Sequence, residues 1–115
     1  MGRTPADRDR LTKALGQRLH DDAEQCRRIG YNPSIFLGMI YDHGPVEACC
    51  RVIMDDVLPS GFARLWELHA LELTAEYTIL HGDWIELFDP AVRRRAEQRL
   101  RQYGWQDSPG GSKSQ

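Results

Sequence analysis

Apolar residues recur along the chain at intervals of three and four, the spacing that places side chains on one face of an α-helix. Near the N-terminus, Thr4-Pro5-Ala6-Asp7 indicates a helix start and Gly30 indicates a helix end. The apolar face between these signals consists of Leu11, Leu15, Leu19, Cys26 and Ile29. The pattern therefore predicts one long amphipathic helix.

The next two segments differ in how much of their surface is apolar. Asn32-Pro33 starts the second segment and His43-Gly44 ends it. Its apolar residues, which leave almost no polar face, are Phe36, Leu37, Met39, Ile40 and Tyr41. We therefore expect this helix at the centre of the fold. Pro45 starts a third helix, whose apolar stripe is Val46, Cys49, Cys50, Ile53, Met54 and Val57.

Turn and capping signals divide the rest of the chain into short helical segments. They are the turn Pro59-Ser60-Gly61, the N-cap Thr74, the capping-box spacing of Asp83-Trp84-Ile85-Glu86, and the helix start Asp89-Pro90. No segment alternates with the period of a β-strand over a useful length. We predict an all-α fold: a compact orthogonal bundle of about six or seven short helices, forming a single helical domain over residues 1–105. Residues 106–115 are predicted to be a disordered polar tail.

Length and composition are those of an ordinary globular protein. A chain of 115 residues, 41% of them hydrophobic, can bury a core without a metal or a disulfide. No apolar run approaches the roughly 20 residues of a membrane helix, and the N-terminus lacks an apolar signal core. The odd number of cysteines, three, argues against a disulfide framework. These features predict a cytoplasmic protein with reduced thiols.

Charge is distributed unevenly, although the formal net charge is only −2. Residues 1–30 hold seven Lys or Arg and five Asp or Glu, residues 31–90 hold two and ten, and residues 91–115 hold six and two. An acidic middle between basic ends bears on the choice of partner and not on the fold.

The last helix carries arginines on every side except its apolar stripe. They are Arg93, Arg94, Arg95, Arg99 and Arg101. Such a face could bind phosphates or an acidic partner. The alternative is an ordinary solvated helix, because Glu97 lies four residues from both Arg93 and Arg101. No aromatic residue alternates with the arginines to form a stacking platform for bases.

The acidic middle offers a second candidate surface, which would suit a basic partner. Its residues are Glu67, Glu72, Glu76, Asp83 and Glu86. Scattered surface carboxylates are the alternative explanation.

No assembled set of catalytic or metal-binding residues is recognisable. His20, His43, His69 and His81 lack the short paired spacing of a zinc site, and His69 is expected at the core or its boundary. Cys49 and Cys50 occupy an apolar stripe, where a thiol is usually an inert small hydrophobe. We therefore expect no metal and no cofactor. A helix-turn-helix around residues 59–61 remains an alternative, although its second helix would be poor in basic residues.

Several short motifs between Gly30 and Trp105 form a pattern. They are Gly30-Tyr31-Asn32-Pro33, Phe36-Leu37-x-Met39, His43-Gly44-x-Val46-Glu47, Ser60-Gly61-Phe62-x-x-Leu65-Trp66-Glu67, Leu73-Thr74-x-Glu76, Trp84-x-x-Leu87-Phe88 and Tyr103-Gly104. The pattern resembles one in an uncharacterised bacterial family of small all-helical proteins and helical segments of larger ones. This resemblance implies a helical fold and leaves the function open.

The leading hypothesis is a non-enzymatic protein-interaction or regulatory module, such as an inhibitor or accessory factor of a bacterial or phage nucleoprotein system. The alternatives are a nucleic-acid-binding protein that uses the basic last helix, and a small enzyme of unknown reaction. Another protein is the expected partner, nucleic acid is the alternative, and no membrane is expected. Self-association is a further hypothesis, because the apolar second helix would leave apolar surface exposed in so small a domain.

Overall fold

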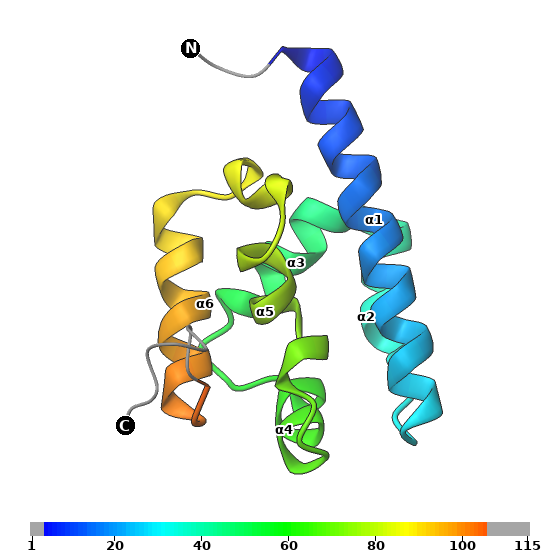
Figure 1. Cartoon of the computed structure of the whole chain (residues 1–115), viewed down its shortest axis with the longest axis vertical. Coiled ribbons are helices and arrows are strands. Elements are labelled where there is room, and N and C mark those ends of the chain that lie inside the picture. The colour runs from blue at the N-terminus through cyan, green and yellow to red at the C-terminus, as the bar shows by residue number, and fades with distance from the viewer. Residues whose placement is uncertain (1–3, 106–115) are drawn as a thin grey trace.

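All of the regular secondary structure in residues 4–105, the part of the chain that the computed structural model describes, is helical. The α-helices are α1 (Pro5–Arg28), α2 (Ser34–His43), α3 (Pro45–Ile53), α4 (Ser60–Glu67), α5 (Ala75–Leu80) and α6 (Pro90–Gln102). Two 3-10 helices, η1 (Leu71–Leu73) and η2 (Asp83–Leu87), join them. The predicted all-α fold is confirmed. Figure 1 shows α1 along one side of the molecule, α6 along the other, and α3 and α5 between them. The tail predicted for residues 106–115 lies outside the described residues.

Two of the predicted helix starts are supported by side-chain caps, and one predicted helix end by a glycine. The Thr4 hydroxyl accepts a hydrogen bond from the Asp7 amide at 3.1 Å, and the Thr74 hydroxyl accepts one from the Tyr77 amide at 3.1 Å. Gly30 ends α1 at φ 94°, a left-handed conformation in which glycine is unstrained. The capping box predicted at residues 83–86 is wrong, since Gly82 precedes η2 and no side chain caps it.

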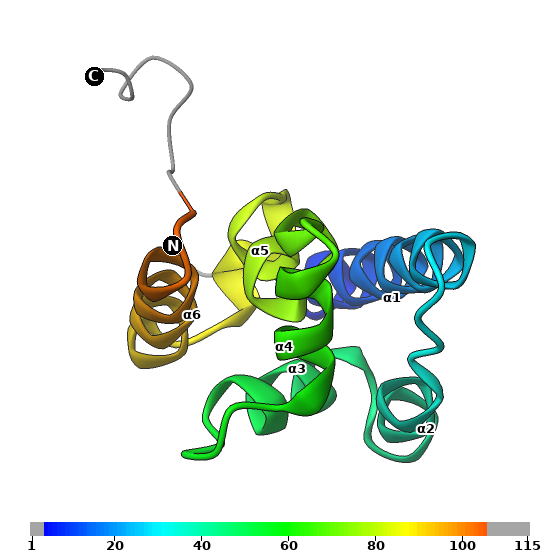
Figure 2. The ribbon, with the colours of Figure 1, turned by 90° about the horizontal axis from the view of Figure 1, so that it is seen from below.

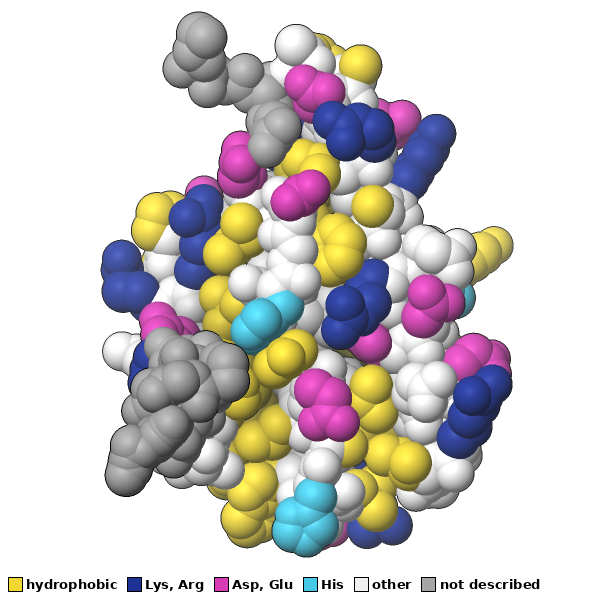
Figure 3. Space-filling view, viewed as in Figure 1, with side chains coloured by type: hydrophobic (Ala, Val, Ile, Leu, Met, Phe, Trp, Pro, Cys, Tyr) yellow, Lys and Arg dark blue, Asp and Glu magenta, His cyan; other side chains and the backbone are white. Residues whose placement is uncertain are grey.

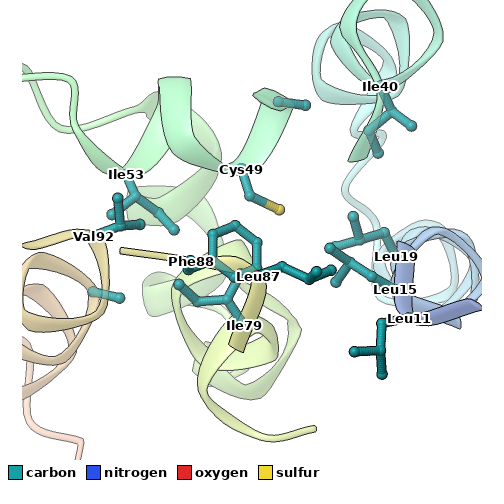
Figure 4. Close-up of a cluster of buried hydrophobic side chains, with 12 residues drawn as sticks. Leu11, Leu15, Leu19, Ile40, Cys49, Ile53, Ile79, Leu87, Phe88 and Val92 are labelled. Atoms are coloured by element: carbon teal, nitrogen blue, oxygen red, sulfur yellow. The ribbon is translucent and has the colours of Figure 1, made fainter. Parts of the chain in front are cut away.

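The main core lies where α1, α3, α5 and α6 meet. In Figure 4, Phe88 lies beside Cys49 of α3, Ile79 lies beside Phe88, and Leu87 extends toward the leucines of α1. Phe88 is only 2% exposed, and Ile79 is fully buried. Burial of such side chains stabilises the fold by about 1.5–3 kcal/mol each. A second, smaller cluster joins α1 to α4 and consists of Cys26, Leu65 and Ala70.

The second helix lies at the edge of the molecule, so the prediction that it is central is wrong. Ile40 is its only buried residue, whereas Ile35 and Tyr41 are 82% and 89% exposed. Figure 2 shows α2 beside α1 and α3, on the opposite edge from α6. Gly44 alone joins the ten-residue helix α2 to α3, so α2 folds back along α3. The neighbouring helices therefore cover only the inner side of α2. The apolar outer side is left uncovered.

Two smaller predictions also differ from the structure. The third helix ends at Ile53, where the Asp55 carboxylate accepts a hydrogen bond from the Val57 amide at 3.0 Å and forms a turn. Val57, expected in the apolar stripe, is therefore 73% exposed. His69 is exposed instead of lying at the core, and it ends α4 in the left-handed conformation with φ 59°.

Candidate functional site

One residue of the predicted basic surface and one residue of the predicted acidic surface are buried inside the protein. Arg99 is 6% exposed and Glu76 is 2% exposed, so neither lies on a solvated face. Arg99 Nη1 donates to Glu76 Oε2 at 2.8 Å. The sequence assigned these two residues to separate surfaces, and that assignment is wrong because α5 and α6 pack side by side and direct them toward each other.

The buried guanidinium of Arg99 also bonds to the end of α3. Its Nη1 donates to the Val52 carbonyl at 3.0 Å, and its Nη2 donates to the Asp55 carbonyl at 2.7 Å. The last carbonyls of a helix have no partner within the helix. Burial raises the pKa of the Glu76 carboxyl, although the Arg99 charge opposes this. Arg99 therefore joins three elements of the fold and has a structural role.

Most of the other predicted basic residues are engaged within the protein. Arg93 Nε donates to the Phe88 carbonyl at 2.9 Å, and Arg95 donates to the Asp55 carbonyl at 2.9 Å. Arg101 pairs with Glu97 at 2.7 Å. Among the residues of the described chain, Arg94 has neither a hydrogen bond nor an ion pair. In Figure 3, Lys and Arg side chains are interspersed with Asp and Glu over the face that is viewed.

The remaining predicted acidic residues are exposed and belong to different elements. Glu67 lies on α4 and pairs with Arg64 at 3.3 Å. Glu72 lies on η1, and Asp83 and Glu86 lie on η2.

A cavity of about 240 Å³ lies between α1, α2 and α4. We call it the α1–α2–α4 pocket, and Figure 2 shows the three helices that surround it. Its walls come from residues 19–26 of α1, residues 31–39, Val52, residues 59–65 and residues 73–76. Most of the lining side chains are apolar. The pocket thus has the size and the chemistry of a site for one side chain or one small molecule.

Among the described residues, two carboxylates are the only charged groups that line the α1–α2–α4 pocket. Asp22 is 6% exposed; its Oδ1 accepts a hydrogen bond from Arg18 Nε at 2.9 Å and its Oδ2 accepts one from the Thr78 hydroxyl. Burial raises the pKa of the Asp22 carboxyl, and these hydrogen bonds oppose the rise. Glu76 is the second carboxylate. It accepts hydrogen bonds from Arg99 and from its own backbone amide.

Tyr31 closes one side of the pocket through a close approach to Gly61. A Cβ atom at position 61 would lie 2.5 Å from the Tyr31 hydroxyl, a distance that real contacts do not allow. A side chain at position 61 would therefore displace the Tyr31 hydroxyl. The hydroxyl makes no hydrogen bond within the described residues. Burial raises the pKa of the Tyr31 phenol.

Four of the motifs set apart in the sequence meet at this pocket. Residues 30–39, 60–67 and 73–76 each contribute to its walls, although they are distant along the chain. Asp22 and Ala23 of α1 were missed as site residues. A signal was present, because Asp22 follows Leu15 and Leu19 at the spacing of the apolar face. A carboxylate at such a position is buried and needs partners.

The cysteines have the environment of core residues. Burial raises the pKa of Cys26 to about 11, and it raises the pKa of the fully buried Cys49 further. These thiols therefore stay protonated and are weak nucleophiles at neutral pH. No group of three His, Cys, Asp or Glu side chains in the described part of the chain is arranged to hold a metal ion.

No helix within residues 4–105 is long and apolar enough to cross a lipid bilayer. Comparison of the chain with protein-family models, with curated proteins and with solved structures finds no significant match.

Proposed function

We propose that this protein is a protein-interaction module that docks a partner by accepting one of its side chains in the α1–α2–α4 pocket. The observation that carries the proposal is a 240 Å³ cavity with mostly apolar walls that continues into exposed apolar residues of α2. Ile35 both lines the pocket and is 82% exposed. Interfaces are typically anchored by a side chain that fills a pocket, with further apolar contacts around it.

The outer side of α2 supports the same proposal. Tyr41 is 89% exposed, and Gly38, which has open space around it, lies between Ile35 and Tyr41 on the helix surface. A glycine inside a helix costs about 0.5–1 kcal/mol relative to alanine. No contact within the described chain requires glycine there, but a partner chain that lies close to the helix would.

The contacts of α6 favour this proposal over nucleic-acid binding through the basic helix. Arg99 is buried, and Arg93, Arg95 and Arg101 bond to carbonyls or carboxylates of the same chain. A phosphate would have to compete with each of these bonds. Arg94 remains for direct contact, and a phosphate-binding surface normally combines several cations.

The test is to select peptides from a displayed random library on the wild-type protein and to measure their affinity for two variants. Ala75→Leu adds a bulky side chain to the pocket wall and leaves both carboxylates in place. The double variant Arg94→Glu/Arg101→Glu changes the basic helix and leaves the pocket alone. We expect the selected peptides to bind Ala75→Leu at least about tenfold more weakly, the effect of losing about 1.4 kcal/mol, and to bind the double variant as they bind the wild type.

Amide chemical shifts in NMR spectra locate the bound peptides independently of the variants. Shifts concentrated on residues 31–39, 60–65 and 73–76 support the pocket. Peptides that bind Ala75→Leu as tightly as the wild type, with shifts on α6, would overturn the proposal. Nucleic acid that binds the wild type and not the double variant would favour the basic helix instead.

A further inference from the structure

We infer that the side chain accepted by the α1–α2–α4 pocket is a lysine, so that the partner segment is basic. The inference rests on the proposed function and adds the chemistry of the occupant. It is carried by the arrangement of the pocket: mostly apolar walls around two buried carboxylates, Asp22 and Glu76, with no Lys, Arg or His among the lining residues of the described chain.

Charge complementarity identifies a cation as the occupant. The two guanidiniums that bond to these carboxylates, Arg18 and Arg99, do not line the pocket. The cavity is therefore bordered by carboxylates whose positive partners lie outside its lining. The Glu76 carboxylate accepts hydrogen bonds from Arg99 and from its own backbone amide. An ionised carboxylate has about four lone-pair sites, so it can accept a further donor that enters the pocket.

The shape and polarity of the walls favour lysine over the other cationic side chains. Phe36, Met39, Phe62 and Leu65 offer apolar surface of the kind that covers a four-carbon stem. A lysine carries a compact ammonium with three donors on such a stem. Arginine has a planar fork that would have to match both carboxylates in one plane. The Tyr31 hydroxyl, which has no partner in the described chain, is an additional acceptor for an ammonium.

The segments that surround the pocket carry net negative charge, as the two carboxylates do. Most of its walls come from residues 31–76, within the stretch 31–90 that holds two Lys or Arg and ten Asp or Glu. An acidic field attracts a basic segment and raises its association rate.

Two small probes separate the charge of the occupant from its apolar stem. The n-butylammonium ion reproduces the lysine side chain, and n-butanol has the same stem without a charge. Each is titrated into the full-length wild-type protein while amide chemical shifts are followed by NMR. We expect butylammonium to produce saturable shifts at Tyr31, Gly61 and Thr74 with a dissociation constant at least about tenfold lower than that of butanol, since hydrogen bonds to charged groups are the stronger ones.

Variants of the protein then assign the effect to the pocket. Asp22→Asn should remove most of the preference for the cation, whereas Asp42→Asn, an exposed carboxylate of α2 outside the lining, should leave it unchanged. Ala75→Leu should weaken the binding of both probes. If Asp22→Asn does not fold, Glu76→Gln replaces it, and the comparison of the two probes on the wild type remains decisive without either variant.

The outcomes distinguish this inference from the proposed function. Equal affinity for butylammonium and butanol at the pocket would overturn the lysine assignment and leave the pocket as a docking site. A preference for butylammonium that persists in Asp22→Asn and Ala75→Leu would mean that the cation binds outside the pocket. This result would also overturn the lysine assignment. Peptides that bind away from the pocket would instead overturn the proposed function. Selected peptides that share a lysine, and that lose affinity when norleucine replaces it, would support both.

Discussion

The helices α2 and α6 show how poorly the polarity of a segment reports its burial in this protein. Six of the ten residues of α2 are Ile, Phe, Leu, Met or Tyr, yet only Ile40 is buried. Five of the thirteen residues of α6 are arginines, yet four residues are buried, and Arg99 is one of them. Each helix packs against two others, α6 against α5 and α3 and α2 against α3 and α1. Burial is therefore decided by which residues face those neighbours, and Arg99 faces them whereas Ile35 and Tyr41 do not.

The difference has a physical cause at each helix. The interior side of α6 faces α5 and the end of α3, which offer a carboxylate and two unpaired carbonyls to Arg99. A buried charge is tolerated when it is paired and hydrogen-bonded in this way. The outer side of α2 has no neighbour in the described chain. Its apolar residues are therefore available to a partner.

The largest effect is expected from removing the buried charge of α6. Arg99→Ala leaves the Glu76 carboxylate buried without its ion pair and leaves two carbonyls without donors, so we expect a loss of about 3–5 kcal/mol in the free energy of unfolding. Urea denaturation measures this loss. The matched control is Arg94→Ala on the exposed side of α6, which should change stability by about 0.5 kcal/mol or less. Equal effects of the two substitutions would contradict the role given to Arg99.

On α2, the contrast lies between the inner and outer sides of one helix. Ile40→Ala removes a side chain that is 8% exposed and should cost about 2–3 kcal/mol, near the lower end for a buried isoleucine because α2 borders solvent. Ile35→Ala, at 82% exposure, should cost about 0.5 kcal/mol or less. Thermal and urea unfolding of the two variants test this. A large loss in Ile35→Ala would mean that the outer side is already covered, for example by a second copy of the chain.

The pH dependence of stability distinguishes the effect of a buried carboxyl group from that of a buried apolar side chain. Burial raises the pKa of the Asp22 carboxyl above its value in the unfolded chain, so the folded state binds this proton more tightly. Above the pKa of Asp22 in the folded state, the ionised carboxylate therefore destabilises the fold. This destabilisation is removed as the pH falls from that pKa toward the pKa of Asp22 in the unfolded chain. The stability of the wild type relative to Asp22→Asn should rise when the pH is lowered from 7 through this range.

Urea denaturation at a series of pH values provides the measurement. Asp21→Asn serves as the control, because Asp21 is the exposed neighbour of Asp22 on α1. Ile40→Ala should keep a constant difference from the wild type over the same range. A relative stability of Asp22→Asn that increases on acidification would have the opposite sign and would contradict the argument.

The smallest expected effect is a gain in stability on the outer side of α2. An alanine side chain at position 38 would meet no atom within 4 Å, and the backbone there is helical. Gly38→Ala should therefore stabilise the protein by about 0.5–1 kcal/mol, chiefly by restricting the unfolded chain. Gly44→Ala is the control with the opposite sign, since Gly44 has φ 87°. A gain in stability together with weaker binding of pocket-directed peptides would show that a partner approaches the helix at Gly38.

Much of the fold could be predicted from local signals, while the candidate site could not. The caps at Thr4 and Thr74 and the glycine stop at Gly30 depend on a few adjacent residues, and the structure confirms them. The α1–α2–α4 pocket depends on contacts between residues far apart in sequence. Tyr31 and Gly61 both belong to motifs noted in the sequence. Nothing in the sequence indicates that the Tyr31 hydroxyl packs against Gly61.

By itself, the sequence determined that the protein is helical and determined most of the helix boundaries, because apolar periodicity and capping act within one or two turns of the chain. Only the tertiary structure decided which faces would be covered. It brought Arg99 of a basic helix against Glu76 of an acidic segment, left the apolar side of α2 open, and placed Asp22 in the wall of a cavity. Burial and pairing are properties of neighbours in space, and a linear pattern does not contain those neighbours.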